Sequence, residues 1–360
     1  MRIHNCHTHI FTNRCVPDHF LKFGLYRLFS NDSFTRPLGR FINTVTSGSC
    51  NDIFDQYTAF ANIGNFRSQE AIFDFLARHY PKGTVFAVLS IDMEYMGAGK
   101  CQVSFEKQLE ELADIRKIHG DTIRPFICAD PRRPAIADLV KRYIEEEGFA
   151  GVKLYPALGF YPFDERLYDL YSYCQNHAIP VMTHCSAIGI HFNYPVTREM
   201  LVHPKTGAQL RKRKKAAFAE VYSHPENYAY VLDRFPELKL CFSHLGGSKE
   251  WHAYLATRWD ETQPVSWLKV ITDLIRNDRY PNLYGDIAYV VNDPTLMNLL
   301  KALLGDRLLR SRILLGTDFY IAEKDISERA HSIDIRGGLS PDDYRQIAEA
   351  NPMCFLSTRY

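Results

Sequence analysis

Two histidines stand one residue apart near the start of the chain, in the stretch NCHTH. Side chains of a β-strand alternate between its two faces, so a strand here would direct His7 and His9 to one side and Cys6 and Thr8 to the other. Two imidazoles about 7 Å apart along a strand can converge on one cation. Since a chain with 14 histidines in 360 residues contains about half such a pair by chance, the pair needs support from elsewhere.

That support comes from other chargeable residues that follow short apolar runs. His184 lies in VMTHC, His244 in LCFSHLGG and Asp318 in LLGTDFY, while Lys153 lies in GVKLYP. Taken singly, a strand-end histidine is more often a hydrogen-bonded rim residue, Asp318 could cap a following helix, and Lys153 could be a structural lysine. Taken together, several imidazoles and a carboxylate suit Zn²⁺ or a similar divalent ion. The set predicts a metal centre.

The elements that must position these residues are short strands alternating with amphipathic stretches. Prolines and a Ser-Pro pair mark expected helix starts at Pro134, Pro294 and Ser340-Pro341. The predicted strands, rich in Val, Ile, Phe and Leu, are Met1–His9, Thr84–Asp92, Ile123–Asp130, Phe149–Tyr155, Ile179–Cys185, Leu238–His244, Leu283–Ile287 and Ile313–Asp318. The predicted helices are Phe105–His119, Pro134–Glu147, Glu165–His177, Val265–Arg276, Pro294–Leu304 and Asp342–Ala350.

This alternation predicts an α/β fold, a distorted (β/α)₈ TIM barrel in a single domain over residues 1–360. The usual barrel core of about 250 residues leaves about 100 over, which we assign to insertions at 11–81 and 186–237, after strands 1 and 5. Both insertions follow strand carboxyl ends, where such a barrel builds its active site. A doubly wound open sheet is the competing architecture, and the lack of a glycine-rich turn after strand 1 disfavours it.

Composition narrows the classes of partner and compartment. The chain has 43 Lys+Arg against 42 Asp+Glu, which does not indicate a polyanion such as nucleic acid as partner of the whole chain. No apolar run reaches the roughly 18–20 residues of a membrane span, and no signal peptide is visible at the start. Nine cysteines are scattered without a CxxC pair. We therefore expect reduced thiols in a cytoplasmic protein without membrane contact.

The same residues carry a resemblance to a known family. His7-Thr8-His9, His184, His244 and Asp318, on successive predicted strands, resemble the amidohydrolase superfamily of metal-dependent hydrolases. The stretches GFAGVKLYPALGF (148–160) and HPENYAYVLDRFPELKLCFSHLGG (224–247) resemble its amidohydrolase-related branch, which also contains decarboxylases. The resemblance covers the barrel strands but neither insertion. It implies the fold, metal chemistry, a small-molecule substrate and paired barrels as a homodimer, and it does not specify the substrate.

The resemblance leaves two ligand sets open. In the binuclear set, His7, His9 and Asp318 would hold one Zn²⁺ and His184 and His244 a second, with a carboxylated Lys153 bridging both ions. In the mononuclear set, His7, His9, His184 and Asp318 would hold one ion and His244 would serve acid–base chemistry. We slightly favour a single ion; other divalent metals are possible.

Either set implies the same chemistry. A divalent ion activates water and takes the charge that develops on a carbonyl oxygen. Asp318 would accept the proton of that water, and His244, if unligated, would orient the water or polarise the carbonyl. The run His184-Cys185-Ser186-Ala187 lacks the proline-containing motif of the decarboxylases, which favours hydrolysis of an ester, lactone or amide of a small polar molecule. A non-oxidative decarboxylase with the same ligands is the alternative enzyme, and a non-catalytic binding protein on the same barrel is a third hypothesis.

Specificity is expected from loops and strand ends. Candidate substrate-binding residues are Tyr155, His191 and Arg198. Asp92 and Asp130 could also face a substrate, but structural capping is the favoured interpretation. The basic run at 211–215 is typical of a solvated helix face, with an anionic substrate or partner as the less favoured alternative. A carboxylate clamp could come from arginines of the first insertion, namely Arg14, Arg27, Arg36, Arg40 and Arg67.

Overall fold

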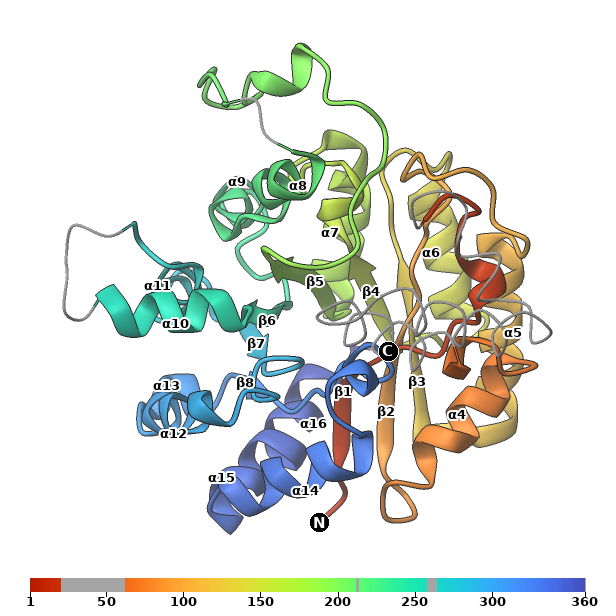
Figure 1. The fold of residues 1–360 in the computed structure, drawn as a ribbon, viewed down its shortest axis with the longest axis vertical. Coiled ribbons are helices and arrows are strands. Elements are labelled where there is room, and N and C mark those ends of the chain that lie inside the picture. Colours follow the sequence, from red (N-terminus) through yellow and green to blue (C-terminus); the bar gives the residue numbers. More distant parts are fainter. Residues whose placement is uncertain (21–61, 212–213, 258–263, 360) are drawn as a thin grey trace, which may run out of the picture.

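The computed structural model describes residues 1–20, 62–211, 214–257 and 264–359. Eight strands form one sheet in the order β1 to β8, and each strand runs parallel to the next. Helices surround this sheet (Figure 1), so the predicted distorted TIM barrel is confirmed. The strands are β1 (His4–Thr8), β2 (Val85–Leu89), β3 (Ile123–Cys128), β4 (Gly151–Leu154), β5 (Val181–Ser186), β6 (Leu240–Gly246), β7 (Leu283–Asp286) and β8 (Ile313–Leu314).

Serine side chains begin several of the helices. Ser68, Ser104, Ser266, Ser327 and Ser340 each accept a backbone N–H from the first turn, which satisfies one of the donors that a helix start leaves free. The described α-helices are α4 (Gln69–Ala77), α5 (Phe105–His119), α6 (Ile136–Glu145), α7 (Tyr168–His177), α8 (Lys215–Ser223), α9 (Ala229–Leu232), α10 (Ser248–Thr257), α11 (Trp267–Ile275), α12 (Met297–Leu304), α13 (Arg307–Arg310), α14 (Glu328–Gly338), α15 (Pro341–Arg345) and α16 (Asn351–Phe355).

Most predicted element boundaries agree with these helices, with two corrections. Helix α5 coincides with its predicted range, and Pro294 and Pro341 stand in the first turns expected for them. Pro134 does not begin α6, because the left-handed Ala135 (φ 52°) separates it from the helix. The single helix expected from Asp342 to Ala350 is instead α15 followed by a π-helical turn.

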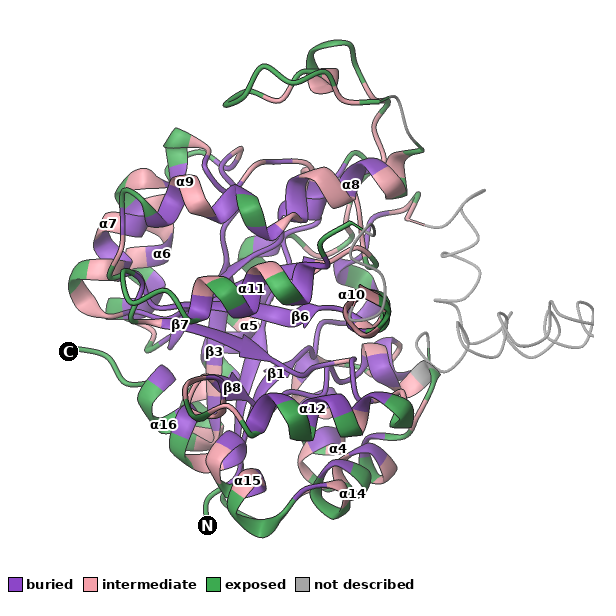
Figure 2. Cartoon of the chain, turned by 90° about the vertical axis from the view of Figure 1, so that its left-hand side faces the viewer, coloured by how far each residue is buried: buried purple, intermediate pink, exposed green. Residues whose placement is uncertain are grey.

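The strands are buried on both faces, as Figure 2 shows by their purple colour. A large apolar cluster fills the space between strands and helices. A second, smaller apolar cluster fills the barrel interior with residues on or next to each strand and one from α16. Its members are Cys6, Ala87, Leu89, Phe126, Ala150, Met182, Cys241, Tyr284, Leu314 and Phe355. Cys6 thus lies inside the barrel, although alternation predicts that it faces away from His7. The reason is a shift of the β1–β2 register between Asn5 and Thr8, which breaks simple alternation.

Strands β8 and β1 meet at a seam where few backbone hydrogen bonds join the barrel wall. Strand β8 has only two residues, and the predicted strand to Asp318 is correspondingly too long. Beyond it the chain follows β1 through separate backbone bonds, from Cys6 N to Leu315 O (2.8 Å) and from Asp318 N to His7 O (2.9 Å), and through one bridge between Thr8 and Phe319. These contacts place residue 318 directly beside residues 7 and 9.

The connections after β1 and β5 are long, as predicted. Between β5 and α8 the chain forms a loop that projects from the body of the molecule (Figures 1 and 2). Of the first insertion, residues 21–61 lie outside the described residues, and with them Arg27, Arg36 and Arg40 of the predicted carboxylate clamp. The single-domain extent over 1–360 stays a prediction. Among the described helices, none has the length and apolar character needed to cross a membrane.

Candidate metal centre

Three predicted ligands meet at the seam between β8 and β1. Asp318 Oδ1 lies 3.4 Å from His7 Nε2 and 3.4 Å from His9 Nε2, and all three side chains are buried. The other ring nitrogens point away from this point: His7 Nδ1 donates to Asp286 Oδ2 (2.9 Å) and His9 Nδ1 donates to the Leu89 carbonyl (2.7 Å). Each imidazole is therefore oriented by a partner behind it, as metal-ligating histidines usually are.

The donor chemistry of this cluster fits a cation. A neutral imidazole that donates through Nδ1 carries only a lone pair on Nε2. Two such lone pairs and a carboxylate oxygen, all within 4.8 Å of one another, are three acceptors without a donor among them. A divalent ion with nitrogen and oxygen ligands satisfies all three at once.

Electrostatics keep the cluster in the protonation states that a metal requires. Burial and the nearby Lys153 lower the pKa of His7 well below its ordinary value, which keeps the ring neutral. Burial raises the pKa of Asp318, but positive charge on the neighbouring imidazoles, His7 first, outweighs this and lowers it to about 2, so the carboxylate balances whatever positive charge, from a proton or an ion, the cluster holds. Asp318 is thus a carboxylate at neutral pH, ready to bind a cation or to accept a proton.

Asp286 is a candidate functional residue that the sequence analysis did not identify. It ends β7, is fully buried, and accepts hydrogen bonds from His7 Nδ1 (2.9 Å), from His244 N (2.9 Å) and from Ala288 N (3.0 Å). Its position at a strand end, in LYGD, was the same signal that identified Asp318. A second group of candidate donors, His7, His244 and Asp286, also lies within 4.8 Å.

His244 faces the same space from β6. Its Nδ1 donates to the Ala288 carbonyl (2.8 Å), which leaves Nε2 as an acceptor, and its ring lies 4.8 Å from that of His7. The backbone at His244 is left-handed (φ 65°), as it is at Asp318 (φ 62°). Non-glycine residues in this conformation are strained and cluster at functional sites.

His184 is near the cluster but not part of it. Its Nε2 donates to the carbonyl of Ile188 (3.1 Å), and its ring stacks on Tyr155 with centroids 4.1 Å apart. Neither of the two metal-type groups found among the described residues includes it. The prediction that His184 is a ligand therefore stays a prediction, and it requires the bond to Ile188 to break.

Lys153 lies in the barrel interior with its side chain fully buried. Its Nζ donates to Ser243 Oγ (3.1 Å). Burial lowers the pKa of Lys153, and Asp286 and Asp318 only partly oppose this effect. A lysine of lowered pKa carries more of the neutral amine, the form that can react with CO₂.

A cavity of about 90 Å³ opens onto the cluster. Its described lining combines histidines, isoleucines and hydroxyl-bearing residues, and none of these lining residues is lysine or arginine. The lining consists of His7, His9, Ile91, Tyr155, His184, Ser186, Ile188, Gly189, Ile190, His244, Gly247, Ser248, Tyr289, Asp318 and Ile321.

The predicted substrate residues fall in different places. Tyr155 lines this cavity, whereas His191 lines a neighbouring one of about 210 Å³. Arg198 is exposed on the connection from β5 to α8 and lines neither cavity. Two of the five basic residues at 211–215 lie outside the described residues; Lys215 donates to the Asn193 carbonyl.

The two strand-end aspartates have structural partners, as favoured. Asp92 Oδ2 accepts from Arg133 Nε (2.7 Å), and Asp130 Oδ2 accepts from Arg132 Nη2 (2.6 Å).

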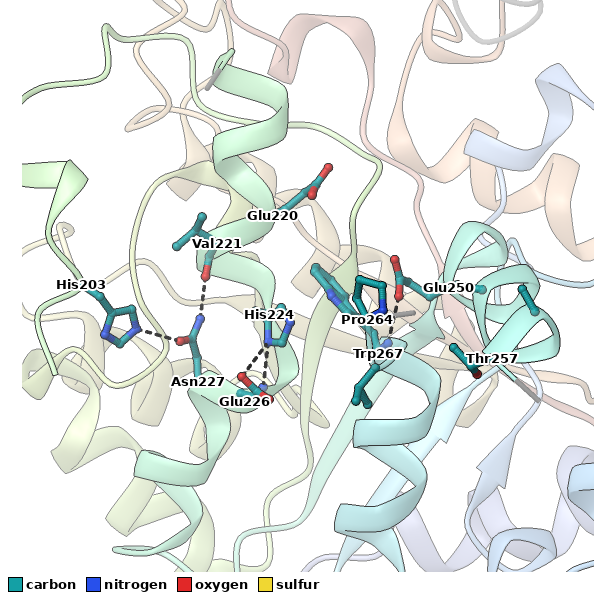
Figure 3. A pocket seen from close by; sticks show the side chains of 13 residues that line it. His203, Glu220, Val221, His224, Glu226, Asn227, Glu250, Thr257, Pro264 and Trp267 are labelled. Carbon is teal, nitrogen blue, oxygen red and sulfur yellow. Dashed lines mark hydrogen bonds and ion pairs between the residues drawn. The ribbon is translucent and has the colours of Figure 1, made fainter. Parts of the chain in front are cut away.

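A larger cavity of about 510 Å³ lies between α8, α10 and the start of α11 (Figure 3). Its walls include Glu220, Glu250 and Trp267 and none of the candidate ligands, so it is separate from the metal centre.

Comparisons with known proteins bear on the family and the fold of the chain. A family model described as amidohydrolase matches residues 87–357. Among curated proteins, none matches the chain. An uncharacterised TIM-barrel protein from Bordetella bronchiseptica is 17% identical with a TM-score of 0.55, and the alignment covers 99% of this chain and 98% of that one.

Two enzymes of known activity share the fold. A 5-carboxyvanillate decarboxylase from Novosphingobium aromaticivorans, complexed with manganese and 4-hydroxy-3-methoxy-5-nitrobenzoic acid, is 14% identical with a TM-score of 0.57, covering 99% of this chain and 96% of that one. A 4-oxalomesaconate hydratase from Rhodopseudomonas palustris is 15% identical with a TM-score of 0.50, covering 98% and 95%. At these identities the likeness establishes the fold alone.

Proposed function

The chain belongs to the amidohydrolase family and is an enzyme, and we propose that it is a metal-dependent hydrolase that attacks the carbonyl of an ester, lactone or amide. The observation that carries this proposal is the ionised Asp318, 3.4 Å from two bare imidazole nitrogens at the base of a cavity. His244 presents a third bare nitrogen to the same cavity. Groups that all accept protons suit the deprotonation of water.

His7, His9 and Asp318 would hold the ion, with His184 as a fourth ligand once it releases Ile188. We propose one ion, Zn²⁺ in preference to Mn²⁺, because three imidazoles and one carboxylate form a common zinc set. The bound ion polarises a carbonyl oxygen and makes water more acidic. A second ion, with Lys153 carboxylated between the two, is the competing arrangement.

The protein's own residues then handle the proton. Asp318 accepts it from the attacking water and returns it to the leaving group, while His244 Nε2 accepts a hydrogen bond that orients the water. Tyr155 and the isoleucines of the cavity exclude bulk solvent from these groups. The proposed substrate is a small molecule; a homodimer and a cytoplasmic location stay predictions.

Asp318→Asn tests the assigned base. The amide keeps an oxygen for the ion but cannot accept a proton, so we expect bound metal to remain near one equivalent while kcat falls by about 10²- to 10⁴-fold. Metal content by atomic absorption and turnover of an ester and lactone panel are the measurements. Near-full activity of Asp318→Asn would show that another group is the base.

A non-oxidative decarboxylase is the second candidate, favoured by one observation. Four isoleucines line the described cavity, and apolar walls of this kind suit an aromatic ring. Without lysine or arginine among the described lining, the ion would be the cation that receives the substrate carboxylate. Turnover in H₂¹⁸O separates the two reactions, because hydrolysis places ¹⁸O in the product acid. Release of CO₂ without ¹⁸O incorporation would replace the hydrolase proposal.

A further inference from the structure

The candidate ligands come from opposite ends of the chain and meet at the seam between β8 and β1, where backbone pairing is sparse. His7 and His9 follow β1, and Asp318 follows the two-residue β8. Among the described residues, β8 and β1 share no ladder of paired residues, only separate backbone bonds and one bridge. Since a ligand displaced by about 1 Å weakens a metal site, the seam needs further support.

A buried polar network on the outer side of this seam supplies contacts to both ligand segments. Asn5 Oδ1 accepts from the backbone N–H of His7 (3.3 Å). Its amide, Nδ2, donates to Thr317 Oγ1 (2.8 Å), and Thr317 directly precedes Asp318 in the chain. Asn5 therefore joins the residue before one ligand to the backbone of another.

Glu328, from the first turn of α14, is the acceptor at the end of this network. Its Oε1 accepts from Thr317 Oγ1 (2.8 Å) and from Tyr80 Oη (2.5 Å), and Asn5 Nδ2 approaches it at 3.4 Å. The side chain is only 1% exposed. The acceptor Oε1 fixes the direction of the network, because each hydroxyl gives its one proton to Glu328 and must accept from Asn5.

We propose that Glu328 is a positioning residue of the metal centre. It holds Thr317 and Asn5 across the seam and so keeps Asp318 at the distance from His7 and His9 that one ion requires. This role rests on the proposed metal centre but not on which reaction the enzyme catalyses. The alternative is that Glu328 only anchors α14 to the barrel.

Metal affinity separates these two roles without using turnover. Chelator-treated protein is titrated with Zn²⁺ and with Mn²⁺ in a calorimeter, for wild type and for variants shown by circular dichroism to be folded. Glu328→Leu removes the acceptor and should weaken metal binding by about 10- to 100-fold, the usual effect of losing support behind a ligand. Glu328→Gln keeps an oxygen at the Oε1 position and should stay within about 3-fold of wild type.

Ser327→Ala is the matched control. It removes the cap of α14, whose oxygen accepts from Ala330 N, and leaves in place the side chains whose hydrogen bonds join Asn5, Tyr80, Thr317 and Glu328. We expect a lower urea midpoint with metal affinity unchanged from wild type. If Ser327→Ala weakened metal binding as much as Glu328→Leu, the role of Glu328 would be anchorage of the helix.

Thr317→Val and Thr317→Ser decide the question if Glu328→Leu does not fold. The valine has the shape of threonine without its hydroxyl and should weaken metal binding, whereas the serine restores the hydroxyl and should bind normally. Normal affinity in folded Glu328→Leu or in Thr317→Val overturns the positioning role. Metal binding by wild type without any hydrolysis would instead reject the proposed reaction and leave the positioning role intact, while wild type that binds neither metal would overturn both.

Discussion

His7, His9 and His244 each donate Nδ1 to another polar group, and this support determines how well a metal would be bound. Asp286 is the carboxylate that supports His7 directly. It fixes the tautomer of His7 by accepting from Nδ1, and it also accepts from the backbone of His244. Loss of such a carboxylate leaves the imidazole free to rotate and makes its Nε2 a poorer ligand.

Asp286→Asn should therefore weaken metal binding by about 10- to 100-fold while the fold is kept. The measurement is calorimetric titration of chelator-treated protein with Zn²⁺. Asp92→Asn is the control, because Asp92 is an equally buried strand-end aspartate that pairs with Arg133 rather than with a ligand. Equal affinities of Asp286→Asn and wild type would show that His7 does not depend on this contact.

What the sequence predicted about the site follows from strand geometry. His7, His9 and Asp318 were identifiable because chargeable residues after apolar runs mark the carboxyl ends of barrel strands. The orientation of His184 was not, since its bond to Ile188 depends on the path of the following loop. Asp286 also follows an apolar run at a strand end, so the signal that identifies Asp318 applies to it as well.

Among the elements, the segment after β5 packs closely against the site. Gly189 (φ +142°) brings the backbone against the ring of His184 and the hydroxyl of Tyr155. A Cβ at this position would lie 2.9 Å from His184 Nε2 and 2.7 Å from Tyr155 Oη, closer than such atoms approach. Glycine here is therefore required both by the backbone and by the packing.

Gly189→Ala should cost more stability than backbone strain alone. Gly207 is the control within the same connection: it also has positive φ (+67°), but a Cβ there meets no atom within 4 Å. We expect Gly207→Ala to lose about 1 kcal/mol and Gly189→Ala clearly more, measured by urea unfolding. Equal losses would mean that the segment moves away from His184 at little cost.

Helices were predictable where their buried residues repeat with helical spacing. Helix α5 buries Phe105, Leu109, Leu112 and other residues at intervals of three and four, and its limits were predicted correctly. Helix α10 buries only Trp251, and two of the three buried residues of α14 are Glu328 and His331. Their apolar pattern is too sparse to indicate a helix, so both were missed.

At the scale of the whole molecule, a bound ion would join the two ends of the barrel. Its ligands stand at positions 7, 9 and 318, on either side of the seam, so binding requires the closed fold. Ion at 100 times its dissociation constant should raise the free energy of unfolding by about 2.7 kcal/mol. For 360 residues this corresponds to a rise in Tm of about 3–4 °C.

Thermal unfolding with Zn²⁺ and with a chelator measures this rise. His9→Ala should abolish it, whereas His252→Ala, which removes an exposed histidine paired with Asp293, should keep it. A rise that survives in His9→Ala would place the stabilising ion elsewhere on the chain.

The pH dependence of the free energy of unfolding should reflect the ionisation of Glu328. Burial raises the pKa of Glu328 to about 7, with Glu323 and Asp318 adding to the effect and hydrogen bonds from Tyr80 and Thr317 opposing it. The unfolded chain releases this proton near pH 4.3, so between these values the folded state holds a proton that the unfolded state lacks. Stability from this group is therefore lost as pH rises.

Glu328→Gln, which cannot ionise, should gain on wild type by up to about 3 kcal/mol between pH 5 and pH 8. Urea unfolding across this range measures the gain, and the exposed Glu110→Gln should show none. A constant difference between Glu328→Gln and wild type would mean that Glu328 is already ionised at pH 5, with its charge stabilised by the hydroxyls of Tyr80 and Thr317.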